Sequence, residues 1–227
     1  MESTKTRILK KLLETDGYLS GQELCEQLGV SRTAVWKYMK QLKEEGYEIE
    51  AVQNKGYCLK DVPDVLGESE IKSRLHTRWA GQTLYYYDEI DSTNTQIKRL
   101  AEEDAPHGTL AVADYQSKGK GRRGRAWDSP HGSAIYMSIL FRPEIRPDRA
   151  SMLTLVIGLS VTQAIRSNLG LQAQIKWPND VVLNGKKLVG ILTEMSAQMN
   201  YIEYLVTGIG INANLREFPE ELADKAT

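Results

Sequence analysis

Apolar residues recur at helical spacing in the first part of the chain. Positions 8, 9, 12 and 13 share one face and predict a helix over residues 4–15, which Asp16-Gly17 ends. Ser20 and Glu23 have the capping-box spacing, so a second helix is expected to start there. Ser31 is placed to cap a third helix whose apolar positions are 35, 39 and 42. Helices joined by a short glycine-containing turn are typical of a helix-turn-helix.

A predicted hairpin follows these helices and resembles the wing of a winged helix. Residues 47–52 and 57–59 favour strands, and residues 53–56 favour the turn. The third helix has no acid from position 31 to 43, and the N-terminal end of a recognition helix meets base edges and phosphates. For residues 1–65 we therefore favour DNA binding over a protein-interaction domain with a solvated basic face. The predicted DNA contacts are Ser31, Arg32, Thr33, Lys37 and Lys55.

After a linker at residues 61–67 the pattern changes to mixed strands and helices. Helices are predicted from about 91 to 103 and from 150 to 169. Strands are predicted at 83–87, 109–113, 134–141, 173–177, 181–183, 187–194 and 201–207. Asn184-Gly185 favours a type I′ turn between two of these strands. The expected fold class is α+β: a winged helix-turn-helix over 1–65, then a mixed β-sheet flanked by helices over 66–227.

Composition narrows the protein class. The chain has 227 residues, a formal net charge of −1 and 41% hydrophobic residues, which suits a small domain plus a medium one. A scan finds no uninterrupted run of about 18 apolar residues, and the N-terminus is polar, so we expect neither a membrane span nor a signal peptide. Cys25 and Cys58 are expected to be reduced thiols in a cytoplasmic protein. The three histidines, His76, His107 and His131, lack metal-ligand spacing, so no metal site is predicted.

The segment from Gln116 to Arg125 has the strongest chemical signal. It holds three glycines and five cations within ten residues, with no acid: Lys118, Gly119, Lys120, Gly121, Arg122, Arg123, Gly124 and Arg125. Glycine lets a backbone approach a ligand, and arginine makes bidentate hydrogen bonds to phosphate or carboxylate. This basic loop (residues 116–125) is therefore predicted to hold an anion.

The basic loop also matches GxGxxG, but its context differs from a dinucleotide fingerprint. That fingerprint leads from a strand into a helix, whereas this loop leads to Trp127 and then to a strand. Three interpretations compete: a nucleic-acid-binding arm, a nuclear-localisation-like run, and an anion-binding catalytic loop. The regular glycines and the strand on each side favour the third, and Trp127 offers a face for an adenine ring.

Two further motifs belong to the same region. Lys176-Trp177-Pro178-Asn179-Asp180 ends a strand at its proline, and the predicted hairpin then brings Lys187 close to that corner. Lys187 also fits an ordinary surface lysine. Ser92-Thr93-Asn94 places two hydroxyls and an amide at a helix start, and taken alone it is best interpreted as an N-cap.

Together these motifs, in this order over residues 1–227, resemble the family of bifunctional biotin protein ligases that also repress biotin genes. Gly208-Ile209-Gly210-Ile211-Asn212 of this sequence also matches a motif of that family, near the end of the region of resemblance. The resemblance implies a central domain like that of class II aminoacyl-tRNA synthetases. It also implies formation of biotinyl-5′-adenylate from biotin and ATP with Mg²⁺. Biotin then passes to a lysine of a biotin carboxyl carrier protein, and the adenylate-bound protein acts as a homodimer on operator DNA.

The resemblance also implies residue roles. Biotin contacts are expected at Ser92, Thr93, Asn94, Gln116, Gly119, Lys120, Gly121, Arg122 and Lys187. Adenylate contacts are expected at Trp127, Asn179 and Asn212, and Arg122 and Lys187 are the expected catalytic residues.

This sequence departs from the family at two places. Lys120 stands where the family usually has arginine, which keeps the charge and loses the bidentate fork. The family's small C-terminal β domain is expected to be absent, with the chain ending at Thr227 in a predicted helix. Two alternatives to the ligase and repressor are a ligand-sensing repressor with little ligase activity and, more weakly, a lipoate ligase.

Overall fold

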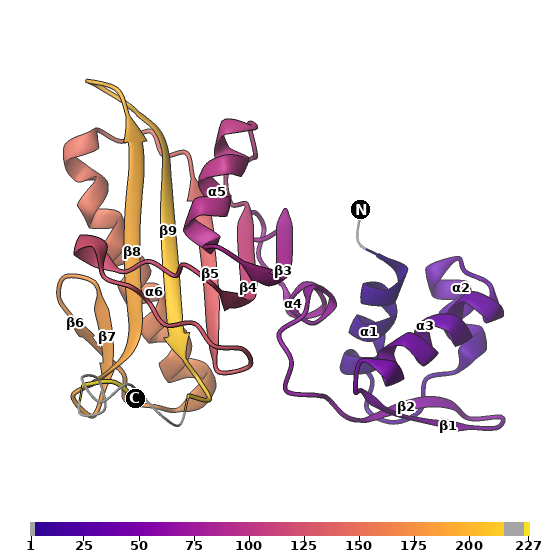
Figure 1. The fold of residues 1–227 in the computed structure, drawn as a ribbon. Coiled ribbons are helices and arrows are strands. Elements are labelled where there is room, and N and C mark those ends of the chain that lie inside the picture. The colour runs from indigo at the N-terminus through magenta and orange to yellow at the C-terminus, as the bar shows by residue number, and fades with distance from the viewer. Residues whose placement is uncertain (1–2, 216–224) are drawn as a thin grey trace. The chain divides into compact units, whose positions relative to one another are not determined.

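The computed structural model describes residues 3–215 and 225–227, and the chain divides into two compact units, residues 1–76 and 77–227 (Figure 1). The helix predicted at the C-terminal end lies mostly outside the described residues. The winged helix-turn-helix and the mixed sheet with helices are both present, so the predicted α+β class is confirmed.

The first unit is a small helical domain with a two-stranded hairpin. Its elements are α1 (Thr4–Glu14), α2 (Gly21–Leu28), α3 (Arg32–Glu44), β1 (Glu48–Val52), β2 (Gly56–Asp61) and α4 (Glu68–Arg74). Ser20 and Ser31 are N-caps, since each side-chain oxygen accepts a hydrogen bond from a backbone N–H of the first turn. The apolar faces of the three helices and the hairpin bury one core that includes Ile8, Leu24 and Leu42.

A close backbone approach fixes the start of β2. Gly56 has φ +113°, and a Cβ there would lie 2.1 Å from the carbonyl oxygen of Leu19. Only glycine fits this position. The segment beyond β2 leads into α4, which packs against α1 and belongs to the first unit. The compact unit therefore extends past the linker predicted at 61–67.

The second unit is built on a seven-stranded sheet in the order β3-β4-β5-β9-β8-β7-β6. The strands are β3 (Leu84–Ile90), β4 (Leu110–Gln116), β5 (Ala134–Phe141), β6 (Gln174–Lys176), β7 (Asp180–Leu183), β8 (Lys186–Ala197) and β9 (Ile202–Asn212). Strands β3 and β4 are parallel, and the other paired strands are antiparallel. Asn184 and Gly185 both have positive φ in the β7–β8 turn, as the type I′ prediction requires.

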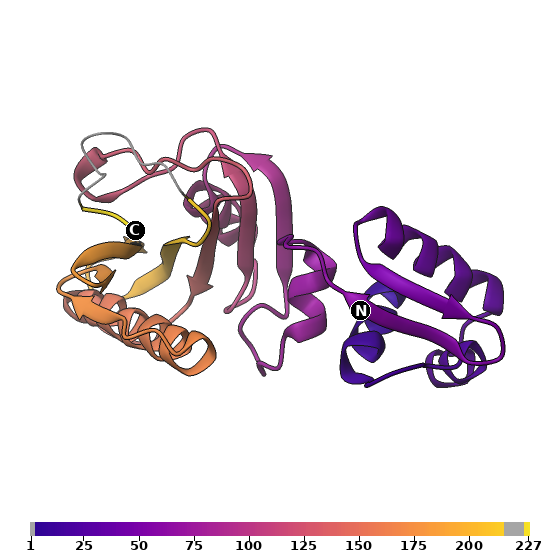
Figure 2. The same cartoon turned by 90° about the horizontal axis from the view of Figure 1, so that it is seen from below.

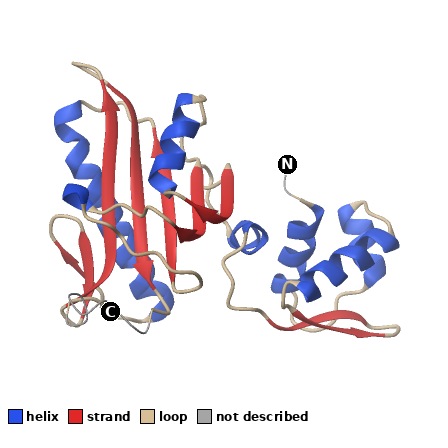
Figure 3. Cartoon of the chain, viewed as in Figure 1, coloured by secondary structure: helices blue, strands red, loops and turns tan. Residues whose placement is uncertain are grey.

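Two helices cover opposite faces of this sheet. Helix α5 (Thr93–Glu102) packs on β4, β5 and β9, and α6 (Ala150–Leu169) packs on β6, β7 and β8. Figure 3 shows α5 in front of the sheet and α6 behind it. Ile97 and Val206 meet on the α5 face, whereas Ile191 and Ile209 pack with α6. In Figure 2 the segment after β4 lies on the side of the sheet away from α6.

Helix α6 with the turn before it, Pro147–Leu169, is long and apolar enough to cross a membrane by length and composition. Its best 18-residue window has a mean hydropathy of 1.2. A candidate span was not expected here from the sequence, because Gln163, Arg166 and other polar residues interrupt the apolar stretch of the helix. One such helix is weak evidence for a span, because sheet-covering helices pass the same test, and α6 buries Val161 and Ile165 against the sheet.

Candidate functional site

The start of α5 is buried against the sheet, and it holds the Ser-Thr-Asn motif. Ser92, Thr93 and Asn94 are each 2–3% exposed. The N–H and hydroxyl of Thr93 lie 2.9 and 3.1 Å from the Oε1 of Gln116, so the side chain of Gln116 closes the first turn of the helix. Ser92 occupies the N-cap position but its side chain makes no cap hydrogen bond. An ordinary cap therefore does not explain the motif.

Asn94 ties α5 to the strands beneath it. Its Oδ1 lies 2.6 Å from the hydroxyl of Ser138 on β5, and its Nδ2 donates to Glu194 on β8 at 2.8 Å. A Cβ on Gly208 would lie 2.2 Å from the same Oδ1, so β9 must carry glycine there. The amide thus links three strands and fixes where α5 begins.

Glu194 places a negative charge beside the start of α5. Burial alone raises the pKa of Glu194, but hydrogen bonds from Lys98 (2.6 Å) and Asn94 lower the pKa more, and the net direction is downward. Lys120 lowers it further by its charge. Ser138 and Glu194 lie far along the chain from the Ser-Thr-Asn motif, so sequence reasoning missed both.

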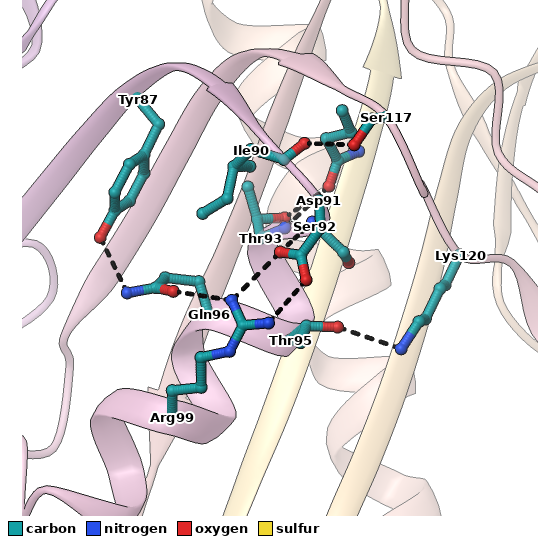
Figure 4. Close-up of polar contacts among 11 residues, drawn as sticks. Tyr87, Ile90, Asp91, Ser92, Thr93, Thr95, Gln96, Arg99, Ser117 and Lys120 are labelled. Atoms are coloured by element: carbon teal, nitrogen blue, oxygen red, sulfur yellow. Dashed lines mark hydrogen bonds and ion pairs between the residues drawn. The ribbon is translucent and has the colours of Figure 1, made fainter.

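A second set of polar contacts anchors the start of the basic loop beside α5 (Figure 4). Asp91 accepts a hydrogen bond from the backbone N–H of Ser92 and forms an ion pair with Arg99 at 2.7 Å. The backbone N–H of Lys118 donates to the carbonyl of Asp91 at 2.8 Å. Burial alone raises the pKa of Asp91, while the hydrogen bonds from Arg99 and Ser92 lower it more, so the pKa of Asp91 lies below its usual value.

The basic loop folds back on itself as a short hairpin. The N–H of Gly121 donates to the carbonyl of Arg125 at 2.8 Å, and the N–H of Trp127 donates to the carbonyl of Gly119 at 2.9 Å. A Cβ on Gly119 would lie 2.2 Å from the carbonyl oxygen of Trp127, so the close pairing requires glycine. The returning strand is held by Ser129, whose hydroxyl accepts from Gln116 at 3.0 Å.

Two cations of the loop reach different partners. Arg122 donates to the Oδ1 of Asn179 at 2.8 Å, which connects the basic loop to the Lys-Trp-Pro-Asn-Asp corner. Lys120 donates to the hydroxyl of Thr95 on α5 at 3.0 Å (Figure 4). Arg123 has φ +58° within the 3-10 turn Arg122–Gly124, a conformation that costs energy for a residue with a Cβ.

Lys187 lies at the same corner, as the hairpin predicted. Its ammonium is 2.8 Å from the Oδ1 of Asp180 and 5.2 Å from the centroid of the Trp127 ring. Both contacts hold the ammonium in place at this corner. Asp180 is part of the quoted corner motif, but no role was predicted for it. Asn212 completes the group, since its amide donates to the carbonyl of Lys187 at 3.4 Å.

Trp127 lies on a floor made by two glycines of neighbouring strands. Gly190 and Gly210 are paired across β8 and β9. A Cβ at these positions would lie 2.4 and 2.6 Å from the indole ring. The buried Nε1 of Trp127 has no hydrogen-bond partner in the described part of the chain. An unpaired donor of this kind is costly to bury.

A cavity of about 390 Å³ opens between the basic loop and the corner. Its aromatic wall is Trp127, and its polar lining comes from Arg122, Arg123, Arg125, Asp128, Asn179, Asp180, Lys187, Asn212 and Lys225. Pockets of roughly 300–1,000 Å³ hold ligands of drug size. Five cations and two carboxylates line the cavity, so its positive excess suits an anion with an aromatic ring. Among residues 3–215 and 225–227, no cluster of three His, Cys, Asp or Glu side chains forms a metal site.

In the first unit the predicted DNA contacts gather at two places. Arg32, Thr33 and Lys37 are exposed along the first half of α3, and Lys55 lies in the turn between β1 and β2. Ser31 is also exposed, but its hydroxyl accepts from the N–H of Ala34 as the helix cap. Arg32 donates to the side chain of Gln22 at 2.7 Å.

Known proteins share both units. Residues 86–212 match the Biotin/lipoate A/B protein ligase family, and residues 4–58 match an HTH domain. The Bifunctional ligase/repressor BirA of Bacillus spizizenii is 47% identical over the whole chain, which spans 71% of that relative. The Escherichia coli protein of the same description is 35% identical over 94% of the chain, which spans 65% of it.

A solved structure is also similar to part of this chain. The biotin protein ligase from Aquifex aeolicus in complex with biotin and ATP is 41% identical, with a TM-score of 0.54. The match covers 64% of this chain and 59% of that one. These matches define a ligase unit joined to an N-terminal DNA-binding unit. The chain therefore belongs to the biotin/lipoate A/B protein ligase family. The bifunctional ligase/repressors are similar to it over the whole length of this chain.

Proposed function

We propose that the chain is a biotin protein ligase and a biotin-responsive repressor of biotin synthesis genes. The ligase proposal rests mainly on two contacts beside Trp127. Arg122 bonds to Asn179, and Lys187 pairs with Asp180. Two motifs separated by more than fifty residues meet there on one cavity. The likeness to a ligase bound to biotin and ATP supports the same conclusion.

The cavity chemistry suits adenylation. A carboxylate oxygen of biotin attacks the α-phosphorus of ATP, and the bond from that phosphorus to the pyrophosphate oxygen breaks. Two anions approach each other in this step, so fixed cations aimed at the forming bond lower the barrier, most of all where water is excluded. We assign this role to Lys187 and Arg122. Mg²⁺ bound to the triphosphate of ATP would share that charge.

The buried motif at the start of α5 is proposed as the biotin side of the site. Thr93, Asn94 and Gln116 belong to one hydrogen-bonded network that passes through Ser138, and Ser92 is buried beside them. Asn94 acts chiefly by positioning the others. The loop residues Gly119, Lys120, Gly121 and Arg122 close over biotin, with Lys187 at its carboxylate. Trp127, Asn179 and Asn212 take the adenylate.

The second half-reaction needs no nucleophilic side chain of this protein. The ε-amine of a lysine in a biotin carboxyl carrier protein attacks the acyl carbon, AMP leaves, and an amide forms. A thiol or hydroxyl nucleophile is thus not required, consistent with the free Cys25 and the buried Cys58 lying in the first unit.

The first unit is proposed to bind operator DNA through α3 and the wing, as a homodimer when the adenylate is bound. Ser31, Arg32, Thr33, Lys37 and Lys55 are the proposed contacts. Both cysteines are free thiols, which suits the reducing cytoplasm, where ATP and the carrier protein are also available.

Biotin-dependent exchange of labelled pyrophosphate into ATP tests the ligase. We expect exchange with biotin and much less with lipoate at the same concentration. Exchange with lipoate alone would favour a lipoate ligase. Tight biotin binding without exchange would favour the repressor that lacks ligase activity.

A further inference from the structure

Trp36 is an exposed aromatic residue on helix α3. Its side chain is 59% exposed, although tryptophan usually buries most of its surface. The other side of α3 packs normally, because Val35, Met39 and Leu42 are buried in the core of the first unit. The fold of this unit therefore does not account for an indole at position 36.

The neighbours of Trp36 are cationic. Residues four apart lie on one row of a helix, so Arg32, Trp36 and Lys40 follow one another along the same side. Lys37 is next to Trp36 and is also exposed. Since α3 has no acid before Glu44, a partner for this row must be negatively charged and must also offer an apolar group to the indole.

Duplex DNA meets both requirements in its major groove. The phosphates supply the negative charge, and the C5-methyl group of thymine is the apolar group on a base edge there. Phosphate contacts from Lys37 and Lys40 orient the helix without reading sequence. The apolar side chain of Trp36 beside these lysines is placed to contact a base edge.

We propose that Trp36 selects thymine in the operator by packing its indole against the thymine methyl group. This inference rests on the proposed DNA-binding function and adds a residue that determines its specificity. Arg32 lies one helical turn before Trp36, and its guanidinium donates a hydrogen bond to the side chain of Gln22. This bond fixes the N-terminal end of the row.

The test starts from the parent chain, supplied with biotin and MgATP, which selects a duplex from a randomised library. The selected duplex is then remade with dU in place of dT, one position at a time. We expect one or two positions at which dU weakens the parent about fourfold, the effect of one buried methyl group. Trp36→Ala should bind the dT duplex about tenfold more weakly and should not respond to dU at those positions.

Lys37→Ala is the matched control, because it removes a charge from the same helix. It should weaken binding to the dT and dU duplexes equally and should reduce the salt dependence by about one counterion. Trp36→Gln is a second variant, which places a polar side chain at the same exposed position. It replaces Trp36→Ala in the test if Trp36→Ala unfolds the first unit.

The inference is overturned if either Trp36 variant keeps the parent affinity, or if it responds to dU as strongly as the parent does. Altered self-association with unchanged DNA affinity also overturns it, since Trp36 would then contact protein. If the parent selects no duplex at all, the DNA-binding function itself fails, and the inference fails with it.

Discussion

Gly190→Ala tests whether the position of Trp127 controls adenylation. The new Cβ would lie 2.4 Å from the Cζ3 of Trp127, about 1 Å closer than ordinary van der Waals contact at 3.4 Å. The strand cannot yield easily, because Gly190 is paired with Asp180 on one side and Gly210 on the other. The indole must therefore move by about 1 Å.

A shift of this size has a defined cost for catalysis. Displacing a group at a reacting centre by about 1 Å can lower the rate about 10²-fold. Trp127 also lies against Lys187, so the ammonium moves with the ring. We expect Gly190→Ala to lower biotin-dependent pyrophosphate exchange by about two orders of magnitude.

Two controls separate this effect from a general loss of fold. Gly158→Ala makes the same change on the opposite face of the sheet, where the new Cβ would meet Ile191 at an ordinary 3.7 Å. It should leave the exchange rate unchanged. In a Trp127→Ala background the contacts with the indole are gone, and only a 3.1 Å approach to the Cε of the flexible Lys187 side chain remains, so Gly190→Ala should then cost much less. An equal loss of exchange with and without the Trp127 ring would refute the reasoning.

Four further outcomes are expected. Lys187→Ala should slow adenylate formation by about two to three orders of magnitude, measured as pyrophosphate release in a single turnover; a normal rate would contradict its role. Arg122→Ala should lose its bond to Asn179 and release adenylate to solution, which a filter-retention assay detects; retention equal to the parent argues against the loop's role. Arg32→Ala should weaken DNA binding and leave exchange unchanged, and loss of both would contradict separate functions. Asp91→Asn should lower the thermal stability at neutral pH, because the pKa of Asp91 is lowered in the fold. The ionised carboxylate stabilises the fold above the unfolded pKa, and this stabilisation is lost as pH falls below about 4. The melting temperatures of parent and variant should therefore converge in acid.

Much of the fold could be predicted from local patterns in the sequence. Ser20 and Ser31 cap their helices as expected, and Asn184-Gly185 turns the chain between β7 and β8. These predictions succeed because each depends on neighbouring residues only. The basic loop and the Lys-Trp-Pro-Asn-Asp corner also follow from composition and spacing, and the hairpin between β7 and β8 brings Lys187 to Asp180.

The rest of the site depends on strand order, which local patterns do not reveal. Glu194 contacts Asn94 across one hundred residues because β8 and β9 lie beside β5 under α5. Gly190 and Gly210 form the floor for Trp127 only because their strands pair in that register. Sequence reasoning assigned Trp127 to an adenine ring but had no means to find the surface on which it lies.

The most direct test of the account is recovery of the reaction intermediate. The chain is incubated with biotin and MgATP, separated from free ligands, and its bound small molecules are identified by mass spectrometry. We predict that biotinyl-5′-adenylate remains bound to the parent and is strongly reduced in Lys187→Ala. Recovery of only biotin or ATP from the parent, with no adenylate, would contradict the proposal that this cavity performs adenylation.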